Sequence, residues 1–236
     1  MATVILVRHG RSTANSSGVL AGRMPGVKLD PTGIAQARNA ADRIAPIPLA
    51  AIVTSPIQRC KQTAKTILDA QDAPPPWREE KRLTECDYGQ WQGRKIAELT
   101  GEPLWKTVQA QPSAAVFPGG ESMAAMQARA VAAVREQDAA VSAEAGESAV
   151  WVAVSHGDLI KAVLADALGM HLDLFQRLHV DPASISVIRY TESRPFVLAT
   201  NTHAGDLSWL VPPVNAPAES SNDAVVGGGA GPGEAA

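Results

Sequence analysis

Short, continuously apolar segments that alternate with helical patterns constrain the fold of this chain more than any other feature. The first segment, Thr3–Arg8, is apolar from Val4 to Val7, and the segments Ala51–Thr54 and Val150–Val154 are similar. Because such a strand has no polar face, it must be covered on both sides. The alternation therefore predicts an α/β protein, a three-layer α/β/α sandwich with a mostly parallel central sheet.

Two helix starts carry the same local signal, a capping side chain followed by proline. Asp30 precedes Pro31, and Ser55 precedes Pro56, so we expect helices to begin there. The first helix should turn an apolar stripe toward the sheet, made of Ile34, Ala37, Ala41 and Ile44. The other expected elements are a helix from Ser55 to about Leu68, a short strand near Trp77–Arg82, a helix from Ser122 to about Ala143, a helix over His156–Leu168, and strands over Ser184–Tyr190 and Pro195–Thr200.

The last 26 residues, 211–236, differ in composition from the rest of the chain. They hold five Gly, four Pro and six Ala, with no aromatic residue, Lys or Arg. Such a segment cannot bury enough apolar surface to offset its ordering entropy. We therefore predict one folded domain over residues 1–210 and a disordered Gly/Pro/Ala-rich tail over 211–236.

The charge of the expected domain is balanced. The chain has 21 Lys and Arg against 24 Asp and Glu, and three of the acids lie in the tail. A neutral domain lacks the electrostatics of a nucleic-acid or membrane-surface binder, so an anion site must come from a few placed cations. Two cysteines, Cys60 and Cys86, suit a reducing compartment, and the first apolar run is too short for a signal peptide. We expect a cytoplasmic monomer or homodimer with no nucleic-acid or membrane partner.

Polar side chains gather where the buried strands end, which is the edge of an α/β sheet at which ligands bind. The first strand ends in Arg8-His9-Gly10, and the third buried strand ends in Ser155-His156-Gly157. Arg59 lies in the first part of the helix that follows the second strand. Arginine forks suit phosphate oxygens, and histidine can serve as a nucleophile or as a hydrogen-bond donor. These residues predict a phosphate site.

Each of these residues also has an ordinary interpretation. A lone histidine after a strand is more often a polar loop residue, and Arg59 alone would be a solvated helix residue. Two histidines, each followed by glycine and each ending a buried strand, favour a functional site instead. Asn15 would add neutral donors, while Gly10 and Gly157 would let the backbone approach a ligand closely. Residues without an assigned role are His171 and His179 (surface or packing), His203 (near the site or away from it), and the two cysteines.

A metal site is not expected. The chain contains neither a P-loop nor an HExxH motif, and its two cysteines lack zinc-site spacing. His9, His156 and Asp158 could conceivably form a metal site, but the paired arginines beside them would repel a cation.

Five segments together resemble the histidine phosphatase superfamily, whose best-known members are cofactor-dependent phosphoglycerate mutases. Arg8–Asn15 resembles the family signature R-H-G-x-[ST]-x-x-N. The other segments, in the family's order, are Leu29–Ala37 (L-T-x-x-G-x-x-Q-A, with Asp-Pro inserted before the threonine), Ser55–Arg59 (S-x-x-x-R), Leu83–Gly93 (L-x-E-x-x-x-G-x-W-x-G) and Ser155–Gly157. The resemblance covers about residues 3–205 and implies a phosphoglycerate mutase-like fold.

The resemblance also implies a mechanism that needs no metal. Neutral His9 would attack the phosphorus to give a phosphohistidine, while Arg8, Arg59 and His156 hold the equatorial oxygens. Glu85 would protonate the leaving oxygen and later deprotonate water, so it should be desolvated with a raised pKa. Further expected contacts to substrate come from Asn15, the amide region around Gly22, the hydroxyl of Tyr88, and Gly157.

The acceptor of the phosphoryl group separates a phosphatase from a mutase. Family mutases carry extra basic residues, including an adjacent arginine pair, between the acid loop and the second histidine. The corresponding stretch, Gly93–Ala153, has no such pair, and we expect Arg129 and Arg135 to lie on a solvated helix face. We therefore predict a phosphatase for a small phosphorylated metabolite, without a cofactor. The alternatives are a phosphomutase that uses 2,3-bisphosphoglycerate and a non-catalytic phospho-ligand binding domain.

Overall fold

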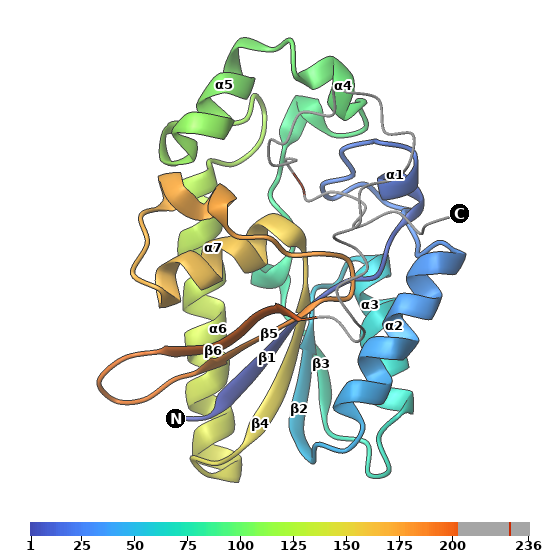
Figure 1. Cartoon of the computed structure of the whole chain (residues 1–236), viewed down its shortest axis with the longest axis vertical. Coiled ribbons are helices and arrows are strands. Elements are labelled where there is room, and N and C mark those ends of the chain that lie inside the picture. The colour runs from blue at the N-terminus through green and yellow to red at the C-terminus, as the bar shows by residue number, and fades with distance from the viewer. Residues whose placement is uncertain (203–226, 228–236) are drawn as a thin grey trace, which may run out of the picture.

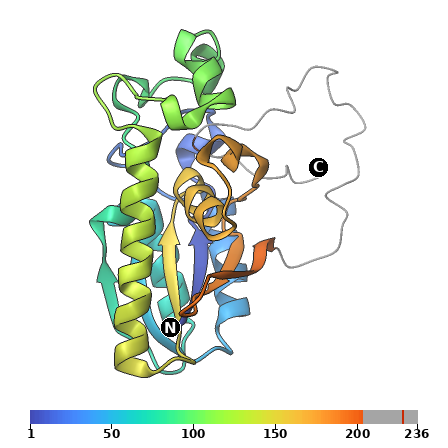
Figure 2. The ribbon, with the colours of Figure 1, turned by 90° about the vertical axis from the view of Figure 1, so that its left-hand side faces the viewer.

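The computed structural model describes residues 1–202 and Gly227 (Figure 1). Apart from Gly227, the expected tail over 211–236 lies outside the described residues, and so does His203. Helices cover both faces of one central sheet, so the expected three-layer α/β/α architecture is confirmed (Figure 2). Among the described residues, no helix is both long enough and apolar enough to cross a lipid bilayer.

The sheet has six strands in the order β3-β2-β4-β1-β5-β6. They are β1 (Thr3–Arg8), β2 (Leu49–Thr54), β3 (Trp77–Glu79), β4 (Val150–Ser155), β5 (Ile185–Arg189) and β6 (Phe196–Thr202). The strands β1, β2, β3 and β4 run parallel to one another, whereas β5 joins β1 and β6 in antiparallel pairs. The sheet is therefore mostly parallel, with an antiparallel edge made by the two C-terminal strands.

Alternate residues of the central strands pack into two separate cores. Val4 and Leu6 of β1 lie under α6 (Met123–Ala145) and α7 (Gly157–Ala167). Ile5 and Val7 lie on the other face, under α2 (Pro31–Ile44) and α3 (Gln58–Asp69). Successive side chains of a strand point to opposite faces, so an uninterrupted apolar run fills both cores at once.

The two expected helix starts have different outcomes. Asp30 caps α2 as expected, and its Oδ1 accepts a hydrogen bond from the Gly33 N–H at 2.7 Å. The prediction for Ser55 was wrong, because α3 begins at Gln58. The hydroxyl of Ser55 is instead hydrogen bonded to His156, at 2.9 Å from Nε2. A capping side chain before proline thus marks only the end of β2 here.

The buried stripe of α2 differs from the expected one by a single position. Ala37, Ala41 and Ile44 are buried, but Ile34 is 40% exposed. Gly33 takes the inner position in the first turn, because the backbone of Gly10 and Arg11 approaches the helix there. The spacing from Gly33 to Ala37, Ala41 and Ile44 follows one face of a helix.

Smaller elements gather beyond the carboxyl ends of the parallel strands (Figure 1). They include the short helices α1 (Thr13–Ser16), α4 (Ile96–Leu99) and α5 (Pro103–Ala110), and the 3-10 turns η1 (Lys81–Leu83), η2 (Gly89–Trp91), η3 (Pro112–Ala114) and η4 (Leu172–Arg177). Their loops enclose the site.

Candidate active site

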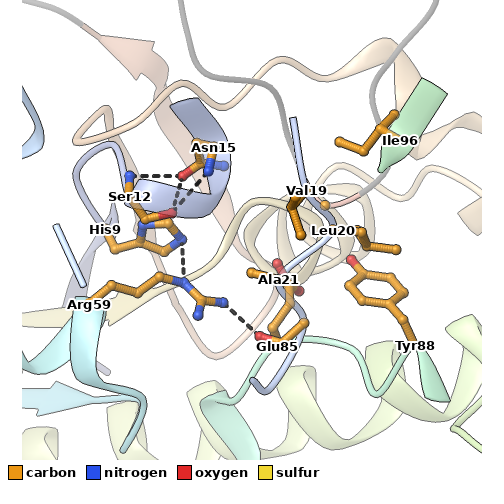
Figure 3. Close-up of a pocket in the computed structure, with 12 residues that line it drawn as sticks. His9, Ser12, Asn15, Val19, Leu20, Ala21, Arg59, Glu85, Tyr88 and Ile96 are labelled. Atoms are coloured by element: carbon orange, nitrogen blue, oxygen red, sulfur yellow. Dashed lines mark hydrogen bonds between the residues drawn. The ribbon is translucent and has the colours of Figure 1, made fainter. Parts of the chain in front are cut away.

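A small pocket lies at this carboxyl edge (Figure 3). In Figure 3, His9, Ser12, Asn15 and Arg59 lie at one end, Leu20, Tyr88 and Ile96 at the other, and Glu85 between them. The lining residues are His9, Ser12, Asn15, Val19, Leu20, Ala21, Gly22, Arg59, Glu85, Tyr88, Ile96 and Gly227. The first end is polar, and the second is largely apolar.

His9 is held as a neutral imidazole with its lone pair on Nε2. Nδ1 donates to the Gly10 carbonyl at 2.7 Å, and Nε2 accepts a hydrogen bond from Nε of Arg59 at 3.0 Å. Arginine can only donate, so Nε2 carries no proton. Burial lowers the pKa of His9 well below its ordinary value, and the charges of Arg59 and Arg8 lower it further. The unprotonated ring is the form in which histidine is a nucleophile.

The register of the sheet places His156 beside His9. Arg8 of β1 pairs with Ser155 of β4, so the residues that follow them leave the sheet together. The two imidazole rings are 5.2 Å apart between centroids. Nδ1 of His156 accepts from Nη2 of Arg59 at 3.1 Å, and Nε2 donates to the Ser55 hydroxyl. Burial, followed by the charge of Arg59, lowers the pKa of His156 well below its ordinary value.

Two buried arginines approach this pair. Nη1 of Arg8 donates to the Val180 carbonyl at 2.8 Å, and Nη2 of Arg59 donates to the Gly22 carbonyl at 2.8 Å. Nη1 of Arg59 is buried and has no hydrogen-bond partner among the described residues. A buried donor left without an acceptor carries a substantial free-energy cost. An oxygen of a bound phosphate would remove that cost.

Glu85 has the properties of a proton donor and acceptor near neutral pH. Its side chain is buried, and Oε1 accepts a hydrogen bond from the Cys86 N–H at 3.0 Å. Burial raises the pKa of Glu85 to about 7, and the negative charge of Asp158 acts in the same direction. A carboxyl group that titrates near the working pH is suited to general acid–base catalysis.

Arg129 holds the loop that carries Glu85, a role that the sequence did not indicate. Its Nη1 donates to the carbonyls of Arg82 and Thr84 at 2.6 and 2.8 Å, and its Nη2 donates to the Glu85 carbonyl at 3.1 Å. The expected solvated position was wrong for Arg129, whose side chain is only 18% exposed. Arg129 flanks the buried stripe of α6, from which it reaches the loop. Arg135 is 51% exposed and forms an ion pair with Asp166, as expected of a surface residue.

Replacing Arg129 by lysine should lower kcat for alkyl phosphates about tenfold, because the single nitrogen of lysine cannot contact three carbonyls and both oxygens of Glu121 at once. The matched control is Arg135→Lys on the exposed face of the same helix, which should change kcat less than about twofold. The pH profile of kcat distinguishes displacement of Glu85 from a general loss of stability. Equal, near wild-type profiles for both variants would show that the loop does not depend on Arg129.

Asn15 and Gly22 lie where the sequence placed them, at the pocket. Oδ1 of Asn15 accepts from the Ser12 N–H at 3.0 Å and from the Ser12 hydroxyl at 2.7 Å. This fixes the side chain and leaves its amide N–H groups for a ligand. Gly22 has φ of +49°, and an added Cβ would overlap the side chain of Gln92. Its carbonyl orients Arg59.

The two glycines after the histidines both lie at buried positions. An added Cβ on Gly10 would overlap the backbone of Gly33, so Gly10 allows a close approach to α2. The predicted approach of Gly10 to a ligand stays a prediction. Gly157 is the first residue of α7 and is buried, one position after His156. Its predicted contact to substrate stays a prediction.

The remaining candidates have no place in the pocket. His171 and His179 are exposed surface residues, with side chains 68% and 78% exposed. Both cysteines are buried free thiols, and burial raises the pKa of Cys60 to about 12. Within residues 1–202 and Gly227, no three His, Cys, Asp or Glu side chains are arranged to hold a metal ion. The sequence missed Ser55 as a partner of His156, although the S-x-x-x-R match contains it.

Comparison with known proteins identifies the family of this chain. The sequence pattern of the histidine phosphatase superfamily (branch 1) matches residues 4–203. Phosphoserine phosphatase 1 of Hydrogenobacter thermophilus is 31% identical over 211 residues, which cover 87% of this chain and 96% of that protein. The probable phosphoglycerate mutase GpmB of Yersinia enterocolitica is 32% identical over 195 residues, covering 82% and 87% of the two chains.

The solved structures agree on the fold. The mycobacterial glucosyl-3-phosphoglycerate phosphatase has a TM-score of 0.74 at 24% identity, covering 85% of this chain and 99% of that one. This similarity is structural, and it does not carry over the substrate named for that protein.

Proposed function

Because the chain belongs to branch 1 of the histidine phosphatase superfamily, we propose that it hydrolyses a small phosphorylated metabolite through a phosphohistidine on His9. One observation carries the proposal. The lone pair of neutral His9 and a buried carboxyl group with a pKa of about 7 line the same pocket. This is the pairing of nucleophile and general acid that such a reaction needs.

In the first step, Nε2 of His9 forms a bond to phosphorus while the bond from phosphorus to the ester oxygen breaks. The proton of Glu85 passes to that oxygen, and the alcohol leaves. Arg8, Arg59 and His156 would hold the equatorial oxygens, where negative charge gathers in the transition state. Nη1 of Arg59 is a donor that still lacks an acceptor among the described residues. Asn15 would add a neutral contact.

In the second step, Glu85 acts in the opposite direction. Its carboxylate takes a proton from a water molecule, the water oxygen bonds to phosphorus, and the bond from phosphorus to His9 breaks. Inorganic phosphate leaves, and both residues return to their starting states. A pKa of about 7 allows both proton transfers with little cost at neutral pH.

We favour hydrolysis over phosphoryl return to a bound acceptor because three of the five basic residues between Gly93 and Ala153 are already held in ion pairs. Of the basic residues between Gly93 and Ala153, Arg94 pairs with Glu102. Arg129 and Arg135 pair with Glu121 and Asp166, respectively. A relative named as a probable phosphoglycerate mutase keeps a phosphomutase as the alternative function.

The proposal includes the conditions under which the enzyme works. We propose that it needs no metal ion, and that 2,3-bisphosphoglycerate is required only if the mutase alternative holds. The expected partner is a small phosphorylated metabolite, without nucleic acid or membrane. The buried free thiols are compatible with the cytoplasm. The oligomeric state is proposed to be a monomer or a homodimer.

Incubation with 3-phosphoglycerate and 2,3-bisphosphoglycerate in EDTA separates the two functions. A phosphatase should release inorganic phosphate and form little 2-phosphoglycerate, and 4-nitrophenyl phosphate serves as the control for general activity. Rapid formation of 2-phosphoglycerate without free phosphate would establish the mutase alternative. Loss of all activity in EDTA, with recovery on adding a divalent cation, would contradict the metal-free mechanism.

A further inference from the structure

A buried carboxylate lies directly behind the leaving-group end of the pocket. Asp158 is fully buried in the first turn of α7, two residues after His156. Its Oδ2 accepts a hydrogen bond from the Tyr88 hydroxyl at 2.7 Å and another from the Gly227 N–H at 2.8 Å. Tyr88 and Gly227 both line the pocket, and Asp158 lies behind them, outside the lining.

The side chains at this end of the pocket can accept a hydrogen bond from a ligand but have no free donor to offer it. Tyr88 has a single hydroxyl proton and gives it to Asp158, so its oxygen can only accept from a ligand. Oδ1 of Asp158 has no hydrogen-bond partner among the described residues, and its nearest cation is Nζ of Lys161 at 3.9 Å. Val19, Leu20 and Ile96 line the pocket nearby and offer no side-chain donor.

Gly227 shows which kind of group this carboxylate takes from the pocket side. The Gly227 N–H reaches Asp158 from a part of the chain 69 residues away. In this contact, an N–H group of the pocket wall points at Oδ2 of Asp158. A hydroxyl or ammonium group of a ligand could make the same contact in place of the Gly227 N–H. A carboxylate of a ligand could not, and it would meet the charge of Asp158 in a poorly solvated site.

We propose, on the basis of the proposed function, that Asp158 and Tyr88 form a subsite for a leaving group with a hydrogen-bond donor near its ester oxygen. The donor is a hydroxyl or an ammonium group, and a carboxylate at that position is disfavoured. The residues around His9 recognise the phosphate that all substrates share, whereas this subsite selects among alcohols. The substrate class is therefore phosphate esters of hydroxylated or aminated alcohols.

The test uses four esters of similar length: propyl phosphate, 2-hydroxyethyl phosphate, 2-aminoethyl phosphate and phosphoglycolate. Wild-type enzyme should hydrolyse the hydroxyl or the amino ester with a kcat/KM about tenfold or more above that of propyl phosphate, mainly through a lower KM. Phosphoglycolate should be the poorest of the four. The comparison of 2-hydroxyethyl phosphate with 2-aminoethyl phosphate identifies which donor is preferred.

The variant Asp158→Asn keeps the shape of the side chain but removes its charge and one acceptor. It should reduce the preference for the donor-bearing esters to less than about threefold and improve phosphoglycolate relative to propyl phosphate. The matched control is Asp166→Asn in the same helix, where the carboxylate pairs with Arg135, and it should leave all four ratios unchanged.

The outcomes separate the subsite from the enzyme activity. If wild-type enzyme hydrolyses all four esters equally, or if Asp158→Asn keeps the full preference, the proposed subsite is contradicted. The proposed phosphatase function is not affected by that result. If neither these esters nor 4-nitrophenyl phosphate is hydrolysed, the proposed function fails and the subsite fails with it. The wild-type ratios decide the question even if Asp158→Asn does not fold.

Discussion

Replacing His9 by alanine is expected to lower kcat/KM for phosphate monoesters by at least about 10³-fold, because the nucleophile is lost. Among the described residues, His9 is the only histidine that lines the pocket. His156 is the neighbouring ring, but unlike His9 it does not line the pocket. Cys60 is also close, but burial raises the pKa of its thiol to about 12, so it is not a thiolate at neutral pH. The measurement is hydrolysis of 4-nitrophenyl phosphate in EDTA.

A covalent trap shows whether the loss comes from the expected intermediate. Wild-type enzyme quenched in alkali after brief mixing with a radiolabelled ester should carry label that is lost in acid, as a phosphoramidate bond is. The His9→Ala variant should carry none. His171→Ala is the matched control, because that histidine is exposed on the surface and should leave labelling and activity unchanged. A labelled, active His9→Ala variant would contradict the mechanism.

The second large effect is expected for Glu85→Gln. Glutamine cannot donate a proton to the departing alkoxide, so kcat for an alkyl phosphate should fall about 10²-fold or more. The loss should be smaller for 4-nitrophenyl phosphate, whose leaving group needs little protonation. An equal loss for both substrates would show that Glu85 does not act as the general acid.

The pH dependence of activity tests the protonation state that this mechanism requires of Glu85. Phosphorylation of His9 needs protonated Glu85, whose pKa is raised to about 7 by burial and by Asp158. Wild-type activity on alkyl phosphates should therefore fall as the pH rises above about 7, and this limb should be absent from Glu85→Gln.

The stability of the same variant provides a folding control. The carboxyl group ionises near its ordinary pKa in the unfolded chain but only near 7 in the folded chain. The stabilisation of the protonated group is thus present below the unfolded pKa and is lost as the pH rises through the folded pKa. Glu85→Gln should have a higher Tm than wild type at pH 8 and a similar Tm at pH 4.

The parts of the fold that follow from local chemistry could be predicted from the sequence. Val4–Val7 has no polar residue, so a doubly covered strand is its only favourable environment. Asp30 caps α2 because its side chain needs only the N–H three residues ahead. Ser55 has the same local pattern, but a hydroxyl can bond equally well to a distant group, and here His156 takes it.

The residues of the candidate site also fall into two groups, those that could be located from the sequence and those that could not. Arg8, His9 and His156 could be located because the ends of adjacent parallel strands meet at one sheet edge. Arg129 and Asp158 could not, because their roles depend on how two helices pack against a loop. Arg129 contacts carbonyl groups more than 40 residues earlier in the chain, and Asp158 meets Tyr88 across 70 residues. Contacts of this kind leave no periodic pattern in a single sequence.

The pairing of Arg8 with Ser155 has a consequence for how this protein can diversify. The separation of the two histidines is set by the hydrogen-bond ladder between β1 and β4, and not by any loop. A one-residue deletion within either strand would reverse the alternation of faces and separate the rings. Residues inserted into the loop between α1 and α2 would leave both rings in place. Loop grafting between relatives should therefore change which alcohol is released while the phosphoryl chemistry persists, which makes the scaffold suitable for recombination.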